Sequence, residues 1–184
     1  MPTWLIIVLA VVALIVFWII GAYNGLVRLR NRVRDQWAQI DVQLKRRFDL
    51  IPNLVETVKG YTKHESETLE NVVKARNTYL SATTPEAQME ANGELTQAIS
   101  KLFALTEAYP DLKANTNFVK MQDDLKETED KISYARQFYN DTVLKYNNKV
   151  EVIPTNIIAG LFGFKKEAFF EAQGAERENV QVKF

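Results

Sequence analysis

The chain has 184 residues and carries 23 Lys and Arg against 23 Asp and Glu, so its formal net charge is zero. This length favours one domain, and the balanced charge excludes a strongly basic nucleic-acid-binding module. The absence of cysteine excludes disulfide frameworks, thiolate zinc sites, iron–sulfur clusters and cysteine nucleophiles.

The charges are distributed unevenly along the chain. Residues 1–27 contain no Asp, Glu, Lys or Arg, whereas residues 28–47 carry a net charge of +5 and the remainder a net charge of −5. An apolar end, a basic collar and an acidic body, in that order, are expected of a membrane-anchored protein.

Residues 4–22 form an apolar segment in which only Gly21 lies outside the apolar set. About 20 helical residues cross a hydrocarbon core ~30 Å thick. Trp18 and Tyr23 lie near the C-terminal end of the segment, where amphipathic rings favour the headgroup level. A cleaved signal peptide fits poorly, because no basic segment precedes the apolar stretch and no A-x-A site follows it. We predict an uncleaved transmembrane anchor over residues 1–27, with a signal peptide or a buried core helix as the alternatives.

Four arginines within seven residues follow the apolar segment: Arg28, Arg30, Arg32 and Arg34. Positive charge is retained in the cytoplasm during insertion, so we expect the short N-terminus outside and the large domain inside. The arginines have two interpretations. They are either a topology signal with snorkelling side chains or a site for anionic lipid headgroups, each contributing about 1 kcal/mol.

Gly21 and Gly25 form a G-x-x-x-G pattern at the predicted membrane boundary. Small residues four apart let two helices approach closely, so this pair is a candidate for self-association. The alternative is an incidental pair of glycines at a segment boundary.

Apolar residues then recur with a helical period across Pro52. They are Val33, Trp37, Ile40, Leu44, Phe48, Ile51, Val55 and Val58. Because a loop would reset this phase, we favour a kinked but continuous helix over a hairpin at Pro52. The stripe resumes at Leu69, Val72, Arg76 and Leu80, which extends the predicted helix over residues 23–80, with residues 60–65 as its weakest stretch.

Two further helices are predicted. Thr84 and Pro85 suit the N-cap and N1 positions of a helix over residues 85–109, and Thr116 or Asn115 can cap a helix over residues 117–149. The third helix has apolar residues at alternating spacings of three and four, which is typical of a coiled-coil seam. No segment alternates with period two, so the predicted fold is all-α: the transmembrane helix continues into a long antiparallel helical bundle.

The predicted lengths leave part of the first helix uncovered. Residues 23–80 would span ~87 Å as a helix, against ~37 Å and ~50 Å for the other two. The exposed stripe would carry Val33, Trp37 and Ile40, and it needs either the C-terminal segment or another copy of the chain as a cover. We therefore expect a homo-oligomer.

A second basic cluster, Lys45, Arg46 and Arg47, lies too far from residue 27 to feel the membrane surface potential. It is a candidate contact for the acidic surface of a neighbouring chain. The alternative is a plain solvated face.

The tail begins where Pro154 ends the third helix. Residues 157–164 are mostly apolar and are followed by Lys165 and Lys166. This pattern fits a short helix that caps the bundle core, or a segment that contacts the membrane surface or another subunit. Residues 171–184 are predicted to be a frayed tail.

No catalytic, cofactor-binding or metal-binding site is predicted. His64 is the single histidine and has Glu65, Glu67 and Glu70 nearby, but a metal site normally needs three or four convergent ligands. No metalloprotease, serine-hydrolase or P-loop pattern occurs.

The sequence resembles the LemA family over residues 23–170. The matching elements are Tyr23-Asn24, Arg30-Asn31, Trp37, residues 40–47, residues 49–61, His64-Glu65, Leu69-Glu70, Ala75-Arg76, residues 109–115, Asn117-Phe118, Thr128-Glu129, Ile132, Arg136, Tyr139-Asn140, Tyr146-Asn147, Pro154 and residues 162–164. The resemblance implies a bacterial single-pass protein of the cell membrane with a cytoplasmic helical domain. It implies no reaction. It suggests an association with membrane proteases or other envelope proteins.

Together these features predict a transmembrane anchor over residues 1–27, a helical bundle over residues 28–170 and the tail. We expect a self-associating membrane scaffold or adaptor that is not an enzyme, needs no cofactor, contacts anionic lipid and binds no nucleic acid. The alternative is a regulatory subunit of a membrane protease or an envelope-remodelling machine.

Overall fold

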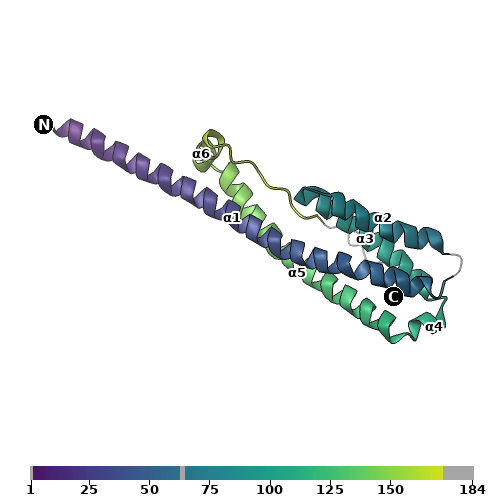
Figure 1. Ribbon diagram of the computed structural model, residues 1–184. Helices are drawn as coiled ribbons and strands as arrows, with labels where there is room; N and C mark the ends of the chain where they lie inside the picture. Colours follow the sequence, from purple (N-terminus) through teal and green to yellow (C-terminus); the bar gives the residue numbers. More distant parts are fainter. Residues whose placement is uncertain (1, 63–64, 172–184) are drawn as a thin grey trace, which may run out of the picture. The chain divides into compact units, whose positions relative to one another are not determined.

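The computed structural model describes residues 2–62 and 65–171, and every regular element among them is a helix (Figure 1). The all-α prediction is confirmed. His64 and residues 172–184 of the predicted tail lie outside the described residues. The helices are α1 (Thr3–Lys59), α2 (Ser66–Ser81), α3 (Pro85–Thr106), α4 (Pro110–Lys113), α5 (Thr116–Glu151) and α6 (Thr155–Leu161).

The described residues form two compact units, and both contain parts of α1 and α5. The first, here called the stem unit, holds residues 2–38 and Gln137–Phe169. The second, the bundle unit, holds the described residues of Gln39–Arg136 together with Phe170 and Glu171. The predicted boundaries at residues 27 and 170 stay predictions, because these units reflect packing and not membrane contact.

Helix α1 continues across Pro52, as the apolar period predicts. Pro52 has no N–H, so the carbonyl oxygen of Phe48 lacks its usual intrahelical donor. That oxygen accepts a hydrogen bond from Arg76 Nε of α2 at 3.2 Å. Pro52 itself is exposed, while Ile51 and Leu54 beside it are buried. The proline is therefore tolerated because a side chain from the next helix replaces the missing donor.

The prediction of one helix over residues 23–80 is wrong, because α1 ends at Lys59. The N–H groups of Tyr61 and Thr62 both donate to the carbonyl of Val58, which forms a turn. The apolar phase restarts with α2. As a result Tyr79 is buried and Leu80, predicted to face inward, is 59% exposed.

Helices α2 and α3 pack against each other as an antiparallel pair in the bundle unit (Figure 1). The predicted cap of α3 is confirmed: the Thr84 side chain accepts a hydrogen bond from the Ala87 N–H at 3.2 Å. Asn115 caps α5 rather than Thr116, since its Oδ1 accepts from the N–H groups of Asn117 and Phe118. Each cap satisfies backbone donors that have no intrahelical partner.

Helix α5 runs antiparallel to α1 within each unit. In the stem unit the ring of Tyr139 lies 5.7 Å from that of Trp37. In the bundle unit Arg46 and Arg47 of α1 pair with Glu127 and Glu129 of α5. The buried stripe of α5 is close to the predicted one: Phe118, Leu125, Thr128, Ile132, Tyr139, Thr142 and Tyr146 are buried.

Helix α5 ends at Glu151, just before Pro154, and α6 follows in the stem unit. Gly163 ends α6 with φ +70°, a conformation that side chains with a Cβ rarely adopt. The Phe164 N–H donates to the carbonyl of Ala159, and the Gly163 N–H to that of Gly160, which together form a Schellman motif. The chain then runs back beside α5, where Asn147 forms hydrogen bonds with both the N–H and the carbonyl of Glu167.

Candidate functional site

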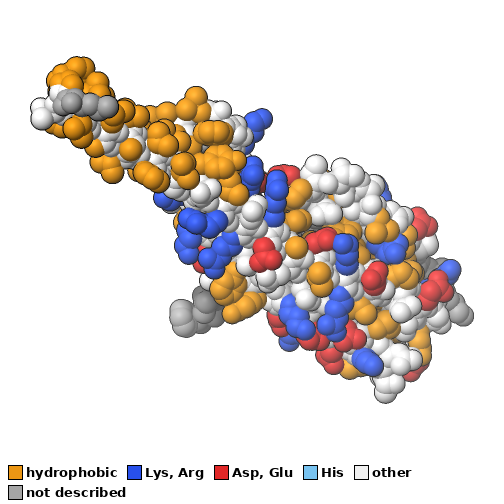
Figure 2. Space-filling model, turned by 60° about the vertical axis from the view of Figure 1, so that its left-hand side comes forward, with side chains coloured by type: hydrophobic (Ala, Val, Ile, Leu, Met, Phe, Trp, Pro, Cys, Tyr) orange, Lys and Arg blue, Asp and Glu red, His pale blue; other side chains and the backbone are white. Residues whose placement is uncertain are grey.

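The N-terminal part of α1 is an apolar surface that the described residues leave exposed. It is the one helix in the described residues that is long and apolar enough to cross a membrane, and no residue of its most apolar window is buried. Trp4, Phe17 and Trp18 are among its exposed side chains. Figure 2 shows this apolar surface giving way to Lys and Arg side chains at its base. The chain therefore has one N-terminal helix compatible with a single membrane crossing.

The four arginines that follow the apolar segment, here called the collar arginines, have different surroundings. Arg28, Arg32 and Arg34 are exposed, as either interpretation of a basic collar requires. Arg30 is half-buried, and its guanidinium lies 4.9 Å from the ring centroid of Phe164. This cation–π contact ties one arginine to the C-terminal segment, whereas the contact of the other three with anionic lipid stays a prediction.

Gly21 and Gly25 present an open face. A Cβ built on either residue would have no atom within 4 Å, other than those of the glycine's own helix backbone and chain neighbours. No other described part of the chain comes within 4 Å of such a Cβ, so the packing role predicted for this pair remains a prediction.

The expectation that the stripe with Val33, Trp37 and Ile40 lies uncovered is wrong. Val33 and Ile40 are buried within the chain, and Trp37 is half-buried against Tyr139. The error follows from the helix break, because α1 ends at Lys59 and α5 is long enough to cover it. These three residues pack inside their own chain, which removes the sequence argument for an oligomer based on them.

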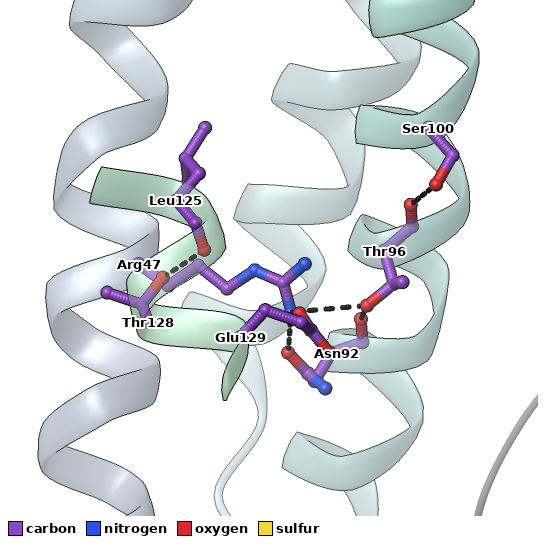
Figure 3. A network of polar contacts seen from close by, with 7 residues as sticks. All are labelled: Arg47, Asn92, Thr96, Ser100, Leu125, Thr128 and Glu129. Atoms are coloured by element: carbon purple, nitrogen blue, oxygen red, sulfur yellow. Dashed lines mark hydrogen bonds and ion pairs between the residues drawn. The ribbon is translucent and has the colours of Figure 1, made fainter. Parts of the chain in front are cut away.

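Arg47 corrects a second expectation, since it is neither on a solvated face nor available to a neighbouring chain. Only 4% of its side chain is exposed. Its Nη1 lies 2.5 Å from Glu129 Oε2, and it donates hydrogen bonds to Asn92 Oδ1 at 2.8 Å and Thr96 Oγ1 at 3.1 Å. Figure 3 shows Arg47 of α1 reaching between α3 and α5 to meet these groups.

The electrostatics of this network follow from its burial. Burial lowers the pKa of Arg47, and the negative charge of Glu129 opposes that shift. A buried cation needs both a counter-ion and hydrogen-bond acceptors, and the network supplies both. The sequence contained a signal for it: Arg47 lies three residues after Leu44 and four before Ile51, so it falls on the buried stripe.

Lys45 and Arg46 remain at the surface and have partners in the same chain. Lys45 Nζ lies 2.6 Å from Asp41 Oδ2, and Arg46 Nη2 lies 3.7 Å from Glu127 Oε2. Asp41 also accepts a hydrogen bond from the Tyr79 hydroxyl at 2.9 Å. The pKa of Tyr79 is raised, chiefly by burial and then by this carboxylate. The expected acidic partners of the basic cluster therefore include groups of its own chain.

A groove of about 850 Å³ lies between α1 and α2 in the bundle unit. Val55, Leu69 and Val73 contribute apolar surface to it, while Lys59 and Glu70 are among its charged groups. Apolar surface beside charges of both signs suits an amphipathic helix. No group of three or more His, Cys, Asp or Glu among residues 2–62 and 65–171 is placed to hold a metal ion.

Comparison with known protein families shows to which family this chain belongs. The sequence model of the LemA family matches residues 36–184. This chain belongs to the LemA family. The match includes Arg47, Pro52 and Arg76, so the contacts that shape the bundle lie within the family region.

Individual relatives are similar over most of the chain. Protein LemA of Metamycoplasma hominis is 26% identical, covering 90% of this chain and 76% of its own length. Magnetosome protein MamQ 2 of Paramagnetospirillum magneticum is 22% identical, and magnetosome protein MamQ of Magnetospirillum gryphiswaldense is 21% identical. Each MamQ match covers 95% of this chain and 74% of the relative. The names of the family and of these relatives describe no enzymatic activity.

Proposed function

We propose that this LemA-family protein is a membrane-anchored helical scaffold or adaptor that self-associates at the cytoplasmic face of the membrane and is not an enzyme. One observation carries the proposal: α1 has an uncovered apolar N-terminal part and then continues as a packed helix of the bundle. An anchor built in this way holds a helical domain at the membrane. Membership of the LemA family and the likeness to MamQ proteins support the membrane association of this helical protein.

The proposed orientation places the N-terminus outside and the bundle in the cytoplasm, because the collar arginines follow the span. The chain has no cysteine, so Thr3→Cys and Ser81→Cys provide single labelling sites. An impermeant thiol reagent on intact cells should label Thr3→Cys and spare Ser81→Cys, which becomes reactive after lysis. In a cell with two membranes, the outer membrane is permeabilised first. The reverse labelling pattern would contradict the cytoplasmic placement.

Self-association is proposed to use Gly21 and Gly25, whose face is open. The full-length chain in mild detergent should run above the size of a monomer. Gly21→Leu with Gly25→Leu should reduce that size, while Ala13→Leu, a matched change elsewhere in the span, should not. A wild type that is monomeric in several mild detergents would contradict the scaffold role.

The groove between α1 and α2 is the surface that we propose for a protein partner. Val73→Asp should reduce recovery of a partner from detergent extracts, and Val119→Asp, at an exposed valine outside the groove, should not. Recovery of a membrane protease in a fixed ratio to the chain would favour the alternative role of a regulatory subunit. Recovery of the chain alone would favour the scaffold.

A further inference from the structure

The C-terminal part of the stem unit has an exposed apolar surface beside the predicted span. It comprises Val152, Ile153, Ile157, Leu161 and Phe162, and is here called the α6 surface. Ile153 and Leu161 are 76% and 75% exposed. The opposite side of α6 is packed, since Ile158 and Ala159 are buried. Five large exposed apolar side chains within residues 152–162, in and beside a short helix, are typical of a surface with a partner.

Contacts within the stem unit fix where this surface lies along α1. The Phe162 ring is 4.8 Å from that of Tyr23, and the buried Phe164 is 5.7 Å from it. A hollow of about 570 Å³ is lined by Trp18 of α1 together with Ile153. The α6 surface therefore lies level with Trp18 and Tyr23, the aromatic residues expected at the boundary between hydrocarbon and headgroups.

The charges around the surface suit a lipid headgroup region. Lys145 and Lys149 line the same hollow as Trp18, and Lys165 follows the surface as an exposed side chain. Lys166 forms an ion pair with Glu151, so it is partly neutralised. Apolar side chains flanked by lysines are the composition of segments that lie in a membrane interface.

We infer that the α6 surface docks into the interface of the same bilayer that α1 crosses, so that the protein has a second membrane contact. The inference rests on the proposed anchoring by α1. A second copy of the chain fits less well, because the surface adjoins the span and lies beside lysines suited to anionic headgroups. The Schellman motif at Gly163 and the Arg30–Phe164 contact hold α6 at this level, so docking needs no refolding.

The experiment uses the full-length chain in vesicles of phosphatidylcholine and phosphatidylglycerol, labelled with an environment-sensitive fluorophore at Leu161→Cys. Leu80→Cys, at an exposed leucine of the bundle unit, is the matched control, and Phe17→Cys reports on the span. A nitroxide on the upper acyl chain should quench the Leu161 label, and its emission should be blue-shifted. The Leu80 label should show neither effect. Lys149→Gln with Lys165→Gln should reduce the quenching at Leu161 in these vesicles and leave the Phe17 label unchanged.

The possible outcomes distinguish docking of the α6 surface from the membrane crossing by α1. Quenching at Phe17 without quenching at Leu161 would overturn the inference and leave the anchor intact. Quenching at Leu161 without quenching at Phe17 would show membrane contact by the α6 surface but contradict the span, and would therefore overturn the inference of a second contact beside a spanning α1. Quenching at neither position would overturn both. A blue-shifted Leu161 label that lipid nitroxide does not quench, with disulfide formation between two copies when the unlabelled Leu161→Cys protein is oxidised, would assign the surface to a second copy instead.

Discussion

Arg76 of α2 donates from Nε to the carbonyl oxygen of Phe48, the oxygen that Pro52 leaves without a donor inside α1. The two helices are joined further by the Phe48 and Tyr79 rings, which stack with centroids 3.7 Å apart. A side chain of α2 thus supplies the hydrogen bond that α1 lacks at Pro52, so the continuity of α1 depends on the position of α2.

This relationship makes a prediction about coupling between Arg76 and Pro52. Arg76→Met should lower the free energy of unfolding by about 1–2 kcal/mol, because a half-buried hydrogen bond from a charged donor is lost. In a Pro52→Ala background, an N–H at position 52 can satisfy the Phe48 carbonyl, so the same change should cost less. Urea unfolding followed by circular dichroism measures all four proteins of the cycle. Lys74→Met, at an exposed position of α2, is the control, and strictly additive effects would contradict the explanation.

The buried ion pair gives a second prediction. Glu129→Gln removes the counter-ion of Arg47 and should destabilise the protein by roughly 2–4 kcal/mol, less than a fully buried pair because Glu129 is 32% exposed. Glu127→Gln, two residues away at an exposed ion pair, should have little effect. Thermal unfolding in mild detergent compares the two variants. Equal unfolding temperatures for them would show that Glu129 contributes no more than a surface carboxylate.

A third prediction compares alanine substitutions at two glycines in and after α6, for which we expect opposite effects on stability. Gly163→Ala should destabilise by about 1–2 kcal/mol, because φ is +70° there and a Cβ strains that conformation. Gly160→Ala should stabilise by up to about 1 kcal/mol, since Gly160 is helical and its new Cβ meets no atom. Chemical unfolding of the full-length chain gives both values, and effects of the same sign would contradict the assigned roles.

The sequence predicted what depends on local period and caps. Continuity across Pro52, the Thr84 cap, the stripe of α5 and the end of that helix before Pro154 all follow from neighbouring residues. The sequence does not predict the end of α1 at Lys59, because the apolar positions before and after residues 60–65 nearly share one helical period. Because of this error, the predicted first helix is too long, and its stripe with Val33, Trp37 and Ile40 is predicted to be exposed.

Side-chain partners depend on tertiary contacts that no local pattern specifies. Arg47 and Lys45 are two residues apart in a basic run, yet one is buried against Glu129 and the other lies at the surface. The position of Arg47 on the buried stripe marks it as inward-facing, but nothing in the sequence identifies Glu129, 82 positions later, as its counter-ion. The contact of Tyr23 with Phe162 is equally non-local, so the level of α6 along α1 came only from the structure.

The last prediction tests whether Ile40, on the stripe that the sequence analysis expected to be exposed, packs within its own chain or against a second copy. Ile40 is fully buried, so Ile40→Ala should lower the free energy of unfolding by about 2–4 kcal/mol through lost burial and a cavity. Val42→Ala, at a side chain that is 60% exposed, should change it by less than about 0.5 kcal/mol. Because the side chains that cover Ile40 belong to its own chain, neither variant should alter the size of the detergent-solubilised protein, measured by light scattering after gel filtration. An Ile40→Ala protein that becomes smaller while keeping the wild-type unfolding free energy would place this residue between copies and contradict the burial described above.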